Sequence, residues 1–403
     1  MRKLAAIAAL LLRLAVLGAA AAGKTGDPGV SADKVLIGSS GPLTGEAAAA
    51  AGVLQGADAY FKYVNSRGGV NGRQIEFKYL DDAYDPAKAV ANVRELIQQD
   101  QVFALFGTVG TNNNLAIRDF VNAAKVPMLF VNAGATTFGR DYKKYPYTIG
   151  YLPTYEGEGK IYARNILASK AKKAKIAVLY QNDDYGRDLL AGLQKGLGKQ
   201  RSKIVSTVSY DPTSTDVSSQ IAQLKASGAN TLCIFAFGKF AIQAFVYVKK
   251  LGWKPQIYVN AVASATGVMQ LAQTSGFTEG AISIVFGKDP ATPLFAKDPG
   301  IKLAAQVIKR FVPGGNPKDG YLVAGMAGAF TLVDTLKKAG KNLTRDGVIK
   351  AATSLNEANN PFLIRGVAVK TTPTSRFPIT QVRLQRWTNG HWTLFGRLLD
   401  AKP

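Results

Sequence analysis

FGTVGTNNNLAIRDFVNAAKVPMLFVNAGATT, residues 106–137, begins where a short apolar run, Val102 to Phe106, leads into a loop of small and polar residues, and it contains a second run and loop of the same kind. A helix-like segment follows the first loop, and the second apolar run spans Met128 to Val131. The order strand, loop, helix, strand and loop is typical of a parallel sheet whose loops meet at the carboxyl edge, where such folds bind ligands. A helix N-terminus in the first loop would suit a carboxylate or a phosphate. The stretch therefore predicts half of a cleft for a small molecule.

The alternation of strand and helix continues through both halves of the chain. The first 150 residues repeat strand–helix units, and the pattern starts again after Tyr147 and runs to a strand at Gln256 to Val259. Repeated units of this kind predict an α/β fold with two similar lobes, each built on a parallel, doubly wound sheet, and a cleft where the lobes meet. Near the C-terminus, Asn389-Gly390 separates two alternating runs, which predicts a hairpin with a type I′ turn.

The N-terminal segment and the bulk composition indicate where the protein works. Residues 1–22 combine a basic start, an apolar run and A-x-A cleavage sites, which predicts a cleaved export signal. A membrane anchor is the alternative, but Arg13 interrupts the apolar run. The formal net charge is +23, yet the lysines are spread along the chain and nucleic-acid motifs are absent from the sequence. We therefore expect an exported, periplasmic protein without a nucleic-acid partner.

Several motifs occur together in an order that resembles one family: VLIGSSGPLTG (35–45), VNSRGGVNGR (64–73), YLDDAYDPAKAV (79–90) and VLYQNDDYGRDLLAG (178–192). The resemblance, over roughly residues 35–399, is to the exported solute-binding proteins of ABC importers, and within them to the leucine/isoleucine/valine-binding protein group. It implies two Rossmann-like lobes, the type I periplasmic-binding fold, joined by three hinge crossovers near residues 150–153, 280 and 372–376.

The resemblance also implies how the chain is divided and what it works with. The first lobe would combine residues 35–149 and 281–371, and the second lobe residues 151–279 and 377–403, with the ligand between them. The protein would be a monomer without a cofactor. It would hand its ligand to an ABC permease, whose ATPase is a separate protein.

Residues of the opening stretch fall on the family's ligand-binding positions. The hydroxyl and the backbone N–H groups that hold the ligand carboxylate in the family correspond to Thr111, Asn112 and Asn113. The backbone carbonyl and the hydroxyl of the second loop correspond to Gly134 and Thr136. The alternative is that these residues only form turns and helix caps.

Aromatic residues of the second lobe complete the implied site. Tyr185 matches an aromatic side chain that closes over the ligand, and Phe237 stands where the family often has tyrosine. Tyr151 and Tyr155, which follow the first crossover, are expected to face the cleft.

Two departures from the family leave the ligand class open. The amino-acid binders hold the ligand ammonium with a glutamate after the strand at Gln256 to Val259, but here the segment 259–267 reads VNAVASATG and contains no acid. An unpaired ammonium in a closed cleft is costly. In the family, an aromatic residue of the first loop forms one wall of the ligand pocket, and here the alanines at 47–51 stand in its place. The ligand is therefore either a branched-chain or related amino acid, with Glu156 or Glu158 as a possible substitute acid, or an aromatic or other apolar carboxylate.

Catalysis and metal binding find little support in the sequence. The single histidine, His391, lies beside the hairpin turn, and the single cysteine, Cys233, lies in an apolar run that predicts a buried strand. Asp81 and Asp82 could suggest a metal site, whereas Asp85 before a proline predicts a helix cap. We therefore expect no enzyme and no metal. An exported ligand sensor for a separate membrane receptor remains an alternative to transport.

Overall fold

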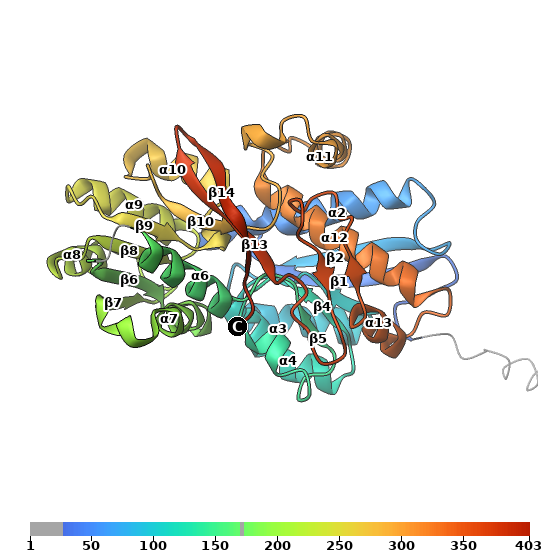
Figure 1. Cartoon of the computed structure of the whole chain (residues 1–403). Helices are drawn as coiled ribbons and strands as arrows, with labels where there is room; N and C mark the ends of the chain where they lie inside the picture. The colour runs from blue at the N-terminus through green and yellow to red at the C-terminus, as the bar shows by residue number, and fades with distance from the viewer. Residues whose placement is uncertain (1–26, 170–172) are drawn as a thin grey trace, which may run out of the picture.

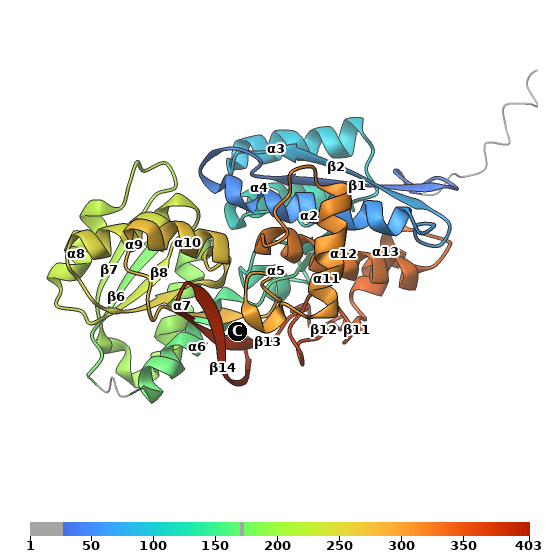
Figure 2. The same cartoon turned by 90° about the horizontal axis from the view of Figure 1, so that it is seen from above.

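The chain forms two α/β lobes that lie side by side, each built around its own sheet (Figure 1; Figure 2). The structure is a computed structural model that describes residues 27–169 and 173–403, so the predicted export signal, residues 1–22, lies outside the described residues. The predicted two-lobed α/β class is confirmed. Among the described residues, no helix combines the length and apolar character that a membrane span requires.

The first lobe contains a sheet in which every neighbouring pair of strands is parallel. Its inner strands β3 and β4 consist entirely of buried residues, as expected of a sheet that helices cover on both faces. In the described part of the chain, the order of its five strands is β2 (Gln74–Asp81), β1 (Lys34–Gly41), β3 (Ala104–Phe106), β4 (Met128–Val131) and β5 (Thr148–Gly150).

The second lobe contains a sheet that continues into the C-terminal hairpin. Asn389 and Gly390 have φ of 52° and 77°, as a type I′ turn requires, so the predicted hairpin is confirmed. The hairpin strands add antiparallel to an otherwise parallel sheet. Within the described residues its seven strands follow the order β14 (His391–Asp400), β13 (Gln381–Thr388), β10 (Ile282–Val285), β9 (Gln256–Val259), β8 (Thr231–Phe235), β6 (Ile176–Gln181) and β7 (Ile204–Tyr210).

The second passage between the lobes differs from the prediction that residues from 281 onward belong to the first lobe. Ile282 in β10 pairs with Tyr258 in β9, and Ser283 pairs with Gln385 in β13. The chain therefore leaves the second sheet after Val285 rather than near residue 280. The first passage follows β5, and the third lies between β13 and the small two-stranded sheet of β11 (Asn356–Glu357) and β12 (Val369–Lys370).

Helices cover both sheets, and side chains fix where several of them begin and pack. Asp85 Oδ1 accepts hydrogen bonds from the backbone N–H groups of Ala87 and Lys88, which confirms the predicted cap of α3. A Cβ at Gly325 would lie 2.0 Å from the carbonyl oxygen of Val53, so glycine allows α12 to pack closely on α2. The described α-helices are α2 (Ala51–Asn65), α3 (Pro86–Arg94), α4 (Thr111–Ala123), α5 (Thr137–Arg140), α6 (Tyr155–Ala168), α7 (Asp184–Leu197), α8 (Ser218–Ala226), α9 (Lys239–Lys250), α10 (Thr266–Ser275), α11 (Pro299–Phe311), α12 (Gly320–Ala339) and α13 (Arg345–Ala352). Shorter helical turns are η1 (Gly45–Ala50), η2 (Glu95–Gln99), η3 (Gly198–Lys203), η4 (Ala261–Ala263) and η5 (Pro293–Phe295).

Candidate ligand-binding cleft

A cavity lies where the carboxyl ends of the two sheets face each other. It offers about 170 Å³ to the centres of water molecules, far more than the roughly 10–15 Å³ that a single water needs. Both lobes line it, because Thr111 follows β3 of the first sheet while Tyr185 and Phe237 follow β6 and β8 of the second. This is the edge of an open α/β sheet at which ligands bind.

Asn114 holds the loop between β3 and α4 in place. Its side-chain oxygen accepts a hydrogen bond from Thr108 Oγ1 at 2.5 Å, and its side-chain nitrogen donates to the carbonyl oxygens of Thr108 at 3.0 Å and Gly110 at 2.6 Å. Gly110 has φ of 96°, and a Cβ there would lie 2.8 Å from the ring of Tyr84. These contacts place Thr111 at the first turn of α4, where backbone N–H groups have no partner within the helix.

Two buried hydroxyl groups at the cavity are available to a ligand. Thr111 Oγ1 and the Tyr185 hydroxyl have no hydrogen-bond partner among the described residues, and the two residues are 1% and 2% exposed. Burial raises the pKa of Tyr185 well above its ordinary value, so its hydroxyl stays protonated and can donate. The Tyr185 ring packs edge-on against Tyr155, with centroids 5.0 Å apart. An unsatisfied buried hydroxyl costs about 1–3 kcal/mol, which a ligand oxygen would relieve.

Gln181, at the end of β6, organises the side of the cavity that the second lobe contributes. Its Nε2 donates to Asp183 Oδ2 at 2.5 Å, and its Oε1 accepts from the Tyr210 hydroxyl at 2.9 Å. The Tyr210 oxygen in turn accepts from the backbone N–H of Phe237 at 3.1 Å. Asp183 is the N-cap of α7, so one network positions both Phe237 and the helix that carries Tyr185.

A strained turn after β2 brings Tyr84 against Phe237 of the other lobe. Ala83 and Tyr84 have φ of 48° and 65°, a conformation that costs non-glycine residues about 1–3 kcal/mol each. Asp82 holds the turn by accepting from the Tyr84 N–H at 2.8 Å and from Ser40 Oγ at 2.9 Å. The rings of Tyr84 and Phe237 are 5.5 Å apart between centroids. The turn therefore supplies an aromatic wall that joins the lobes.

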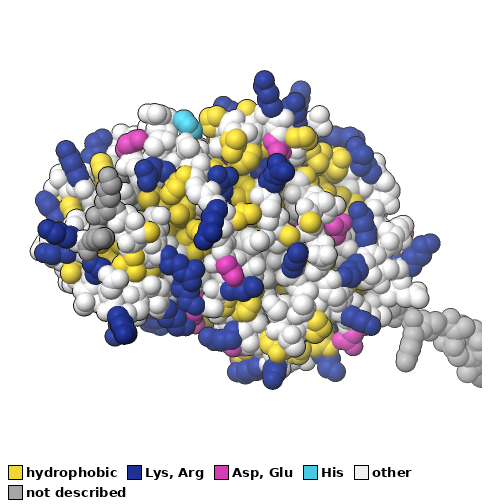
Figure 3. All heavy atoms as spheres, viewed as in Figure 1, with side chains coloured by type: hydrophobic (Ala, Val, Ile, Leu, Met, Phe, Trp, Pro, Cys, Tyr) yellow, Lys and Arg dark blue, Asp and Glu magenta, His cyan; other side chains and the backbone are white. Residues whose placement is uncertain are grey.

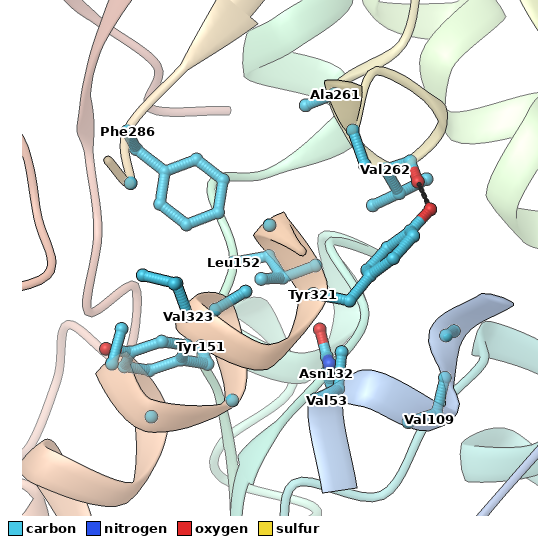
Figure 4. A pocket seen from close by; sticks show the side chains of 18 of the residues that line it. Val53, Val109, Asn132, Tyr151, Leu152, Ala261, Val262, Phe286, Tyr321 and Val323 are labelled. Carbon is cyan, nitrogen blue, oxygen red and sulfur yellow. Dashed lines mark hydrogen bonds between the residues drawn. The ribbon is translucent and has the colours of Figure 1, made fainter. Parts of the chain in front are cut away.

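Figure 4 shows two polar side chains at the cavity, Tyr321 and Asn132. The Tyr321 hydroxyl, from the first turn of α12, donates to the carbonyl oxygen of Val262 in the second lobe at 2.9 Å. Asn132, which directly follows β4, points its carboxamide toward the cavity from the first lobe. Tyr321 thus links the lobes across the cavity, while Asn132 adds a donor and an acceptor close to the first loop.

The charged side chains along the cavity already have partners. Lys288 Nζ lies 2.8 Å from Asp298 Oδ1 and also donates to the carbonyl oxygen of Pro361. Asp289 Oδ2 accepts from the N–H of Thr266 at 3.2 Å and from its hydroxyl at 2.7 Å, and burial raises the pKa of Asp289. Among the described residues that line the cavity, Asp289 is the one carboxylate, so it is the candidate acceptor for a ligand ammonium.

Comparison with known proteins decides the family. The family model described as "Periplasmic binding protein" matches residues 34–391. The chain belongs to this family. Leu/Ile/Val-binding protein homolog 2 of Brucella abortus (strain 2308) is 26% identical to this periplasmic binding protein over 341 residues, covering 83% of this chain and 85% of the relative.

Solved structures show the same fold. A branched chain amino acid ABC transporter protein from Thermus thermophilus with bound valine has a TM-score of 0.80 at 17% identity, covering 92% of this chain and 97% of that one. A fatty acid ABC transporter substrate-binding protein from Thermomonospora curvata has a TM-score of 0.75 at 22% identity, covering 93% and 94%. The resemblance to the leucine/isoleucine/valine-binding protein family and its type I periplasmic-binding fold, stated above from motifs, is therefore confirmed.

The predicted site residues of this periplasmic binding protein divide into two sets. The structure brings the first set to one cavity, with Tyr151 turning its hydroxyl to within 3.2 Å of Thr331 Oγ1. This set consists of Thr111, Tyr151, Tyr155, Tyr185 and Phe237. The residues that lie outside the cavity lining are Asn112, Asn113, Gly134 and Thr136.

Two members of the second set, Gly134 and Thr136, form hydrogen bonds within the protein. Thr136 donates from its backbone N–H and its hydroxyl to Asp188 Oδ2 in α7, at 2.9 Å and 2.8 Å. The carbonyl oxygen of Gly134 accepts from the Tyr155 N–H at 2.8 Å. Both groups, which the sequence assigns to the ligand, form hydrogen bonds with residues of the second lobe in this structure. Asn112 is half-buried and Asn113 is buried in the first turn of α4, and neither residue lines the cavity.

The acids considered as substitutes for the missing glutamate serve the protein itself. Glu156 forms ion pairs with Lys160 and Lys195. Glu158 Oε1 accepts from the Tyr162 hydroxyl at 2.6 Å and from the backbone N–H of Ala261 at 2.7 Å. Neither glutamate lines the cavity.

The residues considered for catalysis or metal binding also have structural roles. Asp81 Oδ1 accepts from the backbone N–H groups of Leu43 and Ala83. Cys233 is fully buried in β8. Among the described residues, no group of three or more His, Cys, Asp or Glu side chains could hold a metal ion. The family is one of solute-binding proteins rather than enzymes.

Sequence reasoning missed Tyr84, Asn132, Asp289 and Tyr321. Tyr84 and Asn132 carried a usable signal, because each follows a predicted strand at the edge where ligands bind. Asp289 also lies shortly after a strand, β10, that ends at the cavity. Tyr321 reaches the cavity only through the way the lobes meet, and no local pattern in the sequence marks it.

Proposed function

We propose that this protein captures a small carboxylate with an apolar side chain between its lobes, in the periplasm, and delivers it to an ABC importer. The observation that carries the proposal is the pair of buried, unpartnered hydroxyls, Thr111 Oγ1 and Tyr185 OH, which reach one cavity from the two lobes. A carboxylate can accept both hydrogen bonds. The N-terminus of α4 beside Thr111 adds a favourable dipole for an anion.

The wall opposite Thr111 favours a ligand without an ammonium group. Ala261, Val262 and Ala265 occupy the segment after β9, where the amino-acid binders of the family place their glutamate. An unpaired ammonium against these side chains would lose its hydration without gaining an acceptor. The substrate-binding protein from Thermomonospora curvata, described as a fatty acid binder, has the same fold and supports an apolar acid as a ligand that this fold can hold.

A branched-chain amino acid is the second candidate, and Asp289 is the observation that favours it. Its carboxylate lines the cavity and could accept from a ligand ammonium if it exchanged the hydrogen bonds from Thr266. The relative in Brucella abortus is called a Leu/Ile/Val-binding protein homolog, and the protein from Thermus thermophilus holds valine.

Matched pairs of ligands separate the two candidates in a thermal-shift experiment on ligand-free protein. Leucine is compared with 4-methylpentanoate, and phenylalanine with 3-phenylpropanoate, since each pair differs only in the ammonium group. Ligand at 100 times its Kd stabilises the folded state by about 2.7 kcal/mol. We expect the acids without an ammonium to raise the unfolding midpoint and the amino acids to leave it unchanged. The reverse result selects the second candidate, and a shift with amides or sugars alone overturns both.

Asp289→Asn provides the internal control. If the ligand is an amino acid, this substitution should weaken it at least tenfold, since a hydrogen bond to a charged group contributes about 1.5–3 kcal/mol. Binding of a simple carboxylate should be retained or should improve, because a nearby negative charge is removed.

Delivery to an importer is tested by reconstitution. The permease and its ATPase are placed in vesicles, and ATP hydrolysis is measured with the loaded and the ligand-free protein. Loaded protein should stimulate hydrolysis. A signalling receptor that responds to the loaded protein, with no stimulation of hydrolysis, would favour the sensor alternative.

A further inference from the structure

The amino-terminal end of the second sheet gathers basic residues from segments that are far apart in the sequence. Ile176 at the start of β6 pairs with Ile204 of β7 and with Thr231 of β8, and Thr231 pairs with Gln256 of β9. The four strands therefore begin side by side, and the segments that precede them share one end of the lobe. The basic pole, as we call this end, comprises Lys173, Lys175, Lys199, Arg201, Lys225, Lys249, Lys250 and Lys254.

The positive charge of the basic pole is not neutralised. All eight side chains are exposed, and none of them forms an ion pair with an acidic side chain in the described part of the chain. The segments 169–175, 198–203, 226–230 and 251–255, which lead into the four strands, contain no Asp or Glu in the sequence. Figure 3 shows Lys and Arg side chains at the left end of the molecule, which is this end of the lobe.

The first lobe shows that such an end need not be basic. Lys34, at the start of β1, pairs with Glu76, and Lys78 pairs with both Glu95 and Asp100, which precedes β3. Acids thus pair with part of the positive charge at the amino-terminal end of the first sheet. The basic pole is a property of the second lobe rather than of parallel sheets.

Stabilisation of helix C-termini accounts for only three of the eight basic residues. Lys225, Lys249 and Lys250 lie in the last turns of α8 and α9, where the helix dipole favours a positive charge. Lys225 also donates to the carbonyl oxygen of Leu251 at 2.6 Å. Five further cations of the pole lie beyond the helix ends, in the loops and in η3. Within the described residues, the side chains of these five form no hydrogen bond and no ion pair.

We propose that the basic pole binds the surface of an anionic lipid bilayer. Eight exposed cations on long side chains, spread over four segments, suit a plane of many mobile anionic headgroups better than a single small anion. The ligand cavity lies at the carboxyl ends of the same strands, so a bilayer at the amino ends leaves the cleft free. Attachment would confine the protein to the membrane surface without blocking ligand capture. This surface is independent of the ligand proposed above.

Sedimentation with vesicles tests the proposal. Full-length mature protein is mixed with vesicles of phosphatidylcholine alone, or of phosphatidylcholine and phosphatidylglycerol at a ratio of three to one, at low and at high salt. We expect binding to the anionic vesicles alone, and a marked weakening at high salt, because charges at a surface are screened. Binding to neutral vesicles of equal strength would overturn the proposal.

A charge-matched pair of variants assigns the binding to the basic pole. The triple variant Lys199→Gln, Arg201→Gln and Lys254→Gln should bind anionic vesicles about 100-fold more weakly, given roughly fivefold per basic residue near such a surface. The control, Lys318→Gln, Lys341→Gln and Lys350→Gln, removes three exposed cations from the first lobe and should bind like the natural protein. Equal loss in both variants, or no binding to anionic vesicles, overturns the proposal. Binding to polyglutamate but not to the vesicles would identify an acidic protein as the partner instead.

Discussion

Two loops of similar composition leave neighbouring strands of the first sheet and do different things. The loop after β3 presents the unpartnered Thr111 hydroxyl to the cavity. The loop after β4 contains Gly134 and Thr136, which bond to the second lobe through Tyr155 and Asp188. One loop therefore offers its polar groups to a ligand, while the other has already used them to join the lobes.

Small, polar loops at the same edge of a sheet can therefore either bind a ligand or hold the two lobes together. A hydroxyl that has a protein partner stabilises the arrangement of the lobes whether or not ligand is present. A hydroxyl without one stabilises the closed form only when a ligand supplies the acceptor. The following substitutions separate these two contributions.

The largest effect is expected at Gly134. A Cβ there would lie 2.6 Å from the carbonyl oxygen of Pro153 and 2.7 Å from the ring of Tyr155, so Gly134→Ala forces the backbone of the first crossover to move. We expect a loss of at least about 3 kcal/mol in the free energy of unfolding, measured with urea. The matched control is Gly107→Ala in the other loop, where φ is +62° but no atom lies within 4 Å of the added Cβ. It should cost about 1–2 kcal/mol, and equal losses would contradict the assigned roles.

Glu158 accepts a hydrogen bond from Ala261 in the cavity wall of the second lobe, and its burial leads to a pH-dependent prediction. Burial raises the pKa of Glu158 to about 7, although hydrogen bonds from Tyr162 and Ala261 lower it. The unfolded chain ionises this glutamate near its ordinary value of 4.5, while the folded protein keeps it protonated until about pH 7. Stability therefore falls as pH rises from about 4.5 to 7, by about 3 kcal/mol from this group.

Glu158→Gln should remove this part of the pH dependence. The variant should match the natural protein at pH 4.5 and be more stable by about 3 kcal/mol at pH 8, as measured by urea unfolding across that range. Some decline with pH should persist, because burial also raises the pKa of Glu357 to about 7. Parallel stability curves for the two proteins would show that Glu158 does not titrate as stated.

The fold could be predicted largely from the sequence because its signals are local. Alternating apolar runs, the Asp85 cap and the Asn389-Gly390 turn each act within a few residues, and the structure confirms them. Whether β10 belongs to the sheet of the first or of the second lobe depends instead on its hydrogen bonds to β13, which comes much later in the chain. No short pattern could have placed the second passage between the lobes after Val285.

The sequence predicts those residues of the candidate site whose place at the cavity depends only on their position after a strand. Thr111, Tyr185 and Phe237 follow strand ends and line the cavity. Thr136 also follows a strand end, but Asp188, whose approach depends on how the lobes meet, takes up its hydrogen bonds. Tyr321 reaches the cavity for the same nonlocal reason. Sequence reasoning therefore found the edge of the site better than it found which polar groups on that edge were free.

Thr111→Val and Thr136→Val compare the two loops directly. Thr111→Val removes an unpartnered hydroxyl, so the free energy of unfolding should stay within about 0.5 kcal/mol, while the affinity for a carboxylate ligand falls at least tenfold. Thr136→Val removes a donor from the buried Asp188 and should cost about 1–2 kcal/mol in stability even without ligand. Calorimetric titration and urea unfolding measure the two quantities. If the two variants lost the same stability and the same ligand affinity, the two loops would not differ in function as stated.

The smallest effect concerns the hydrogen bond that Tyr321 makes across the cavity. Tyr321→Phe removes the donor to Val262 and should lower the stability of the closed form by about 1 kcal/mol, so that ligand dissociates roughly fivefold faster in a stopped-flow measurement. Tyr147→Phe is the control, because its hydroxyl donates to Asp346 within the first lobe, outside the cavity lining, and its loss should leave the dissociation rate unchanged. An unaltered rate in Tyr321→Phe would mean that closure rests on the loop after β4 rather than on this bond. The Thr136 contact with Asp188 would then be the principal link between the lobes, and Thr136→Val should show the faster dissociation instead.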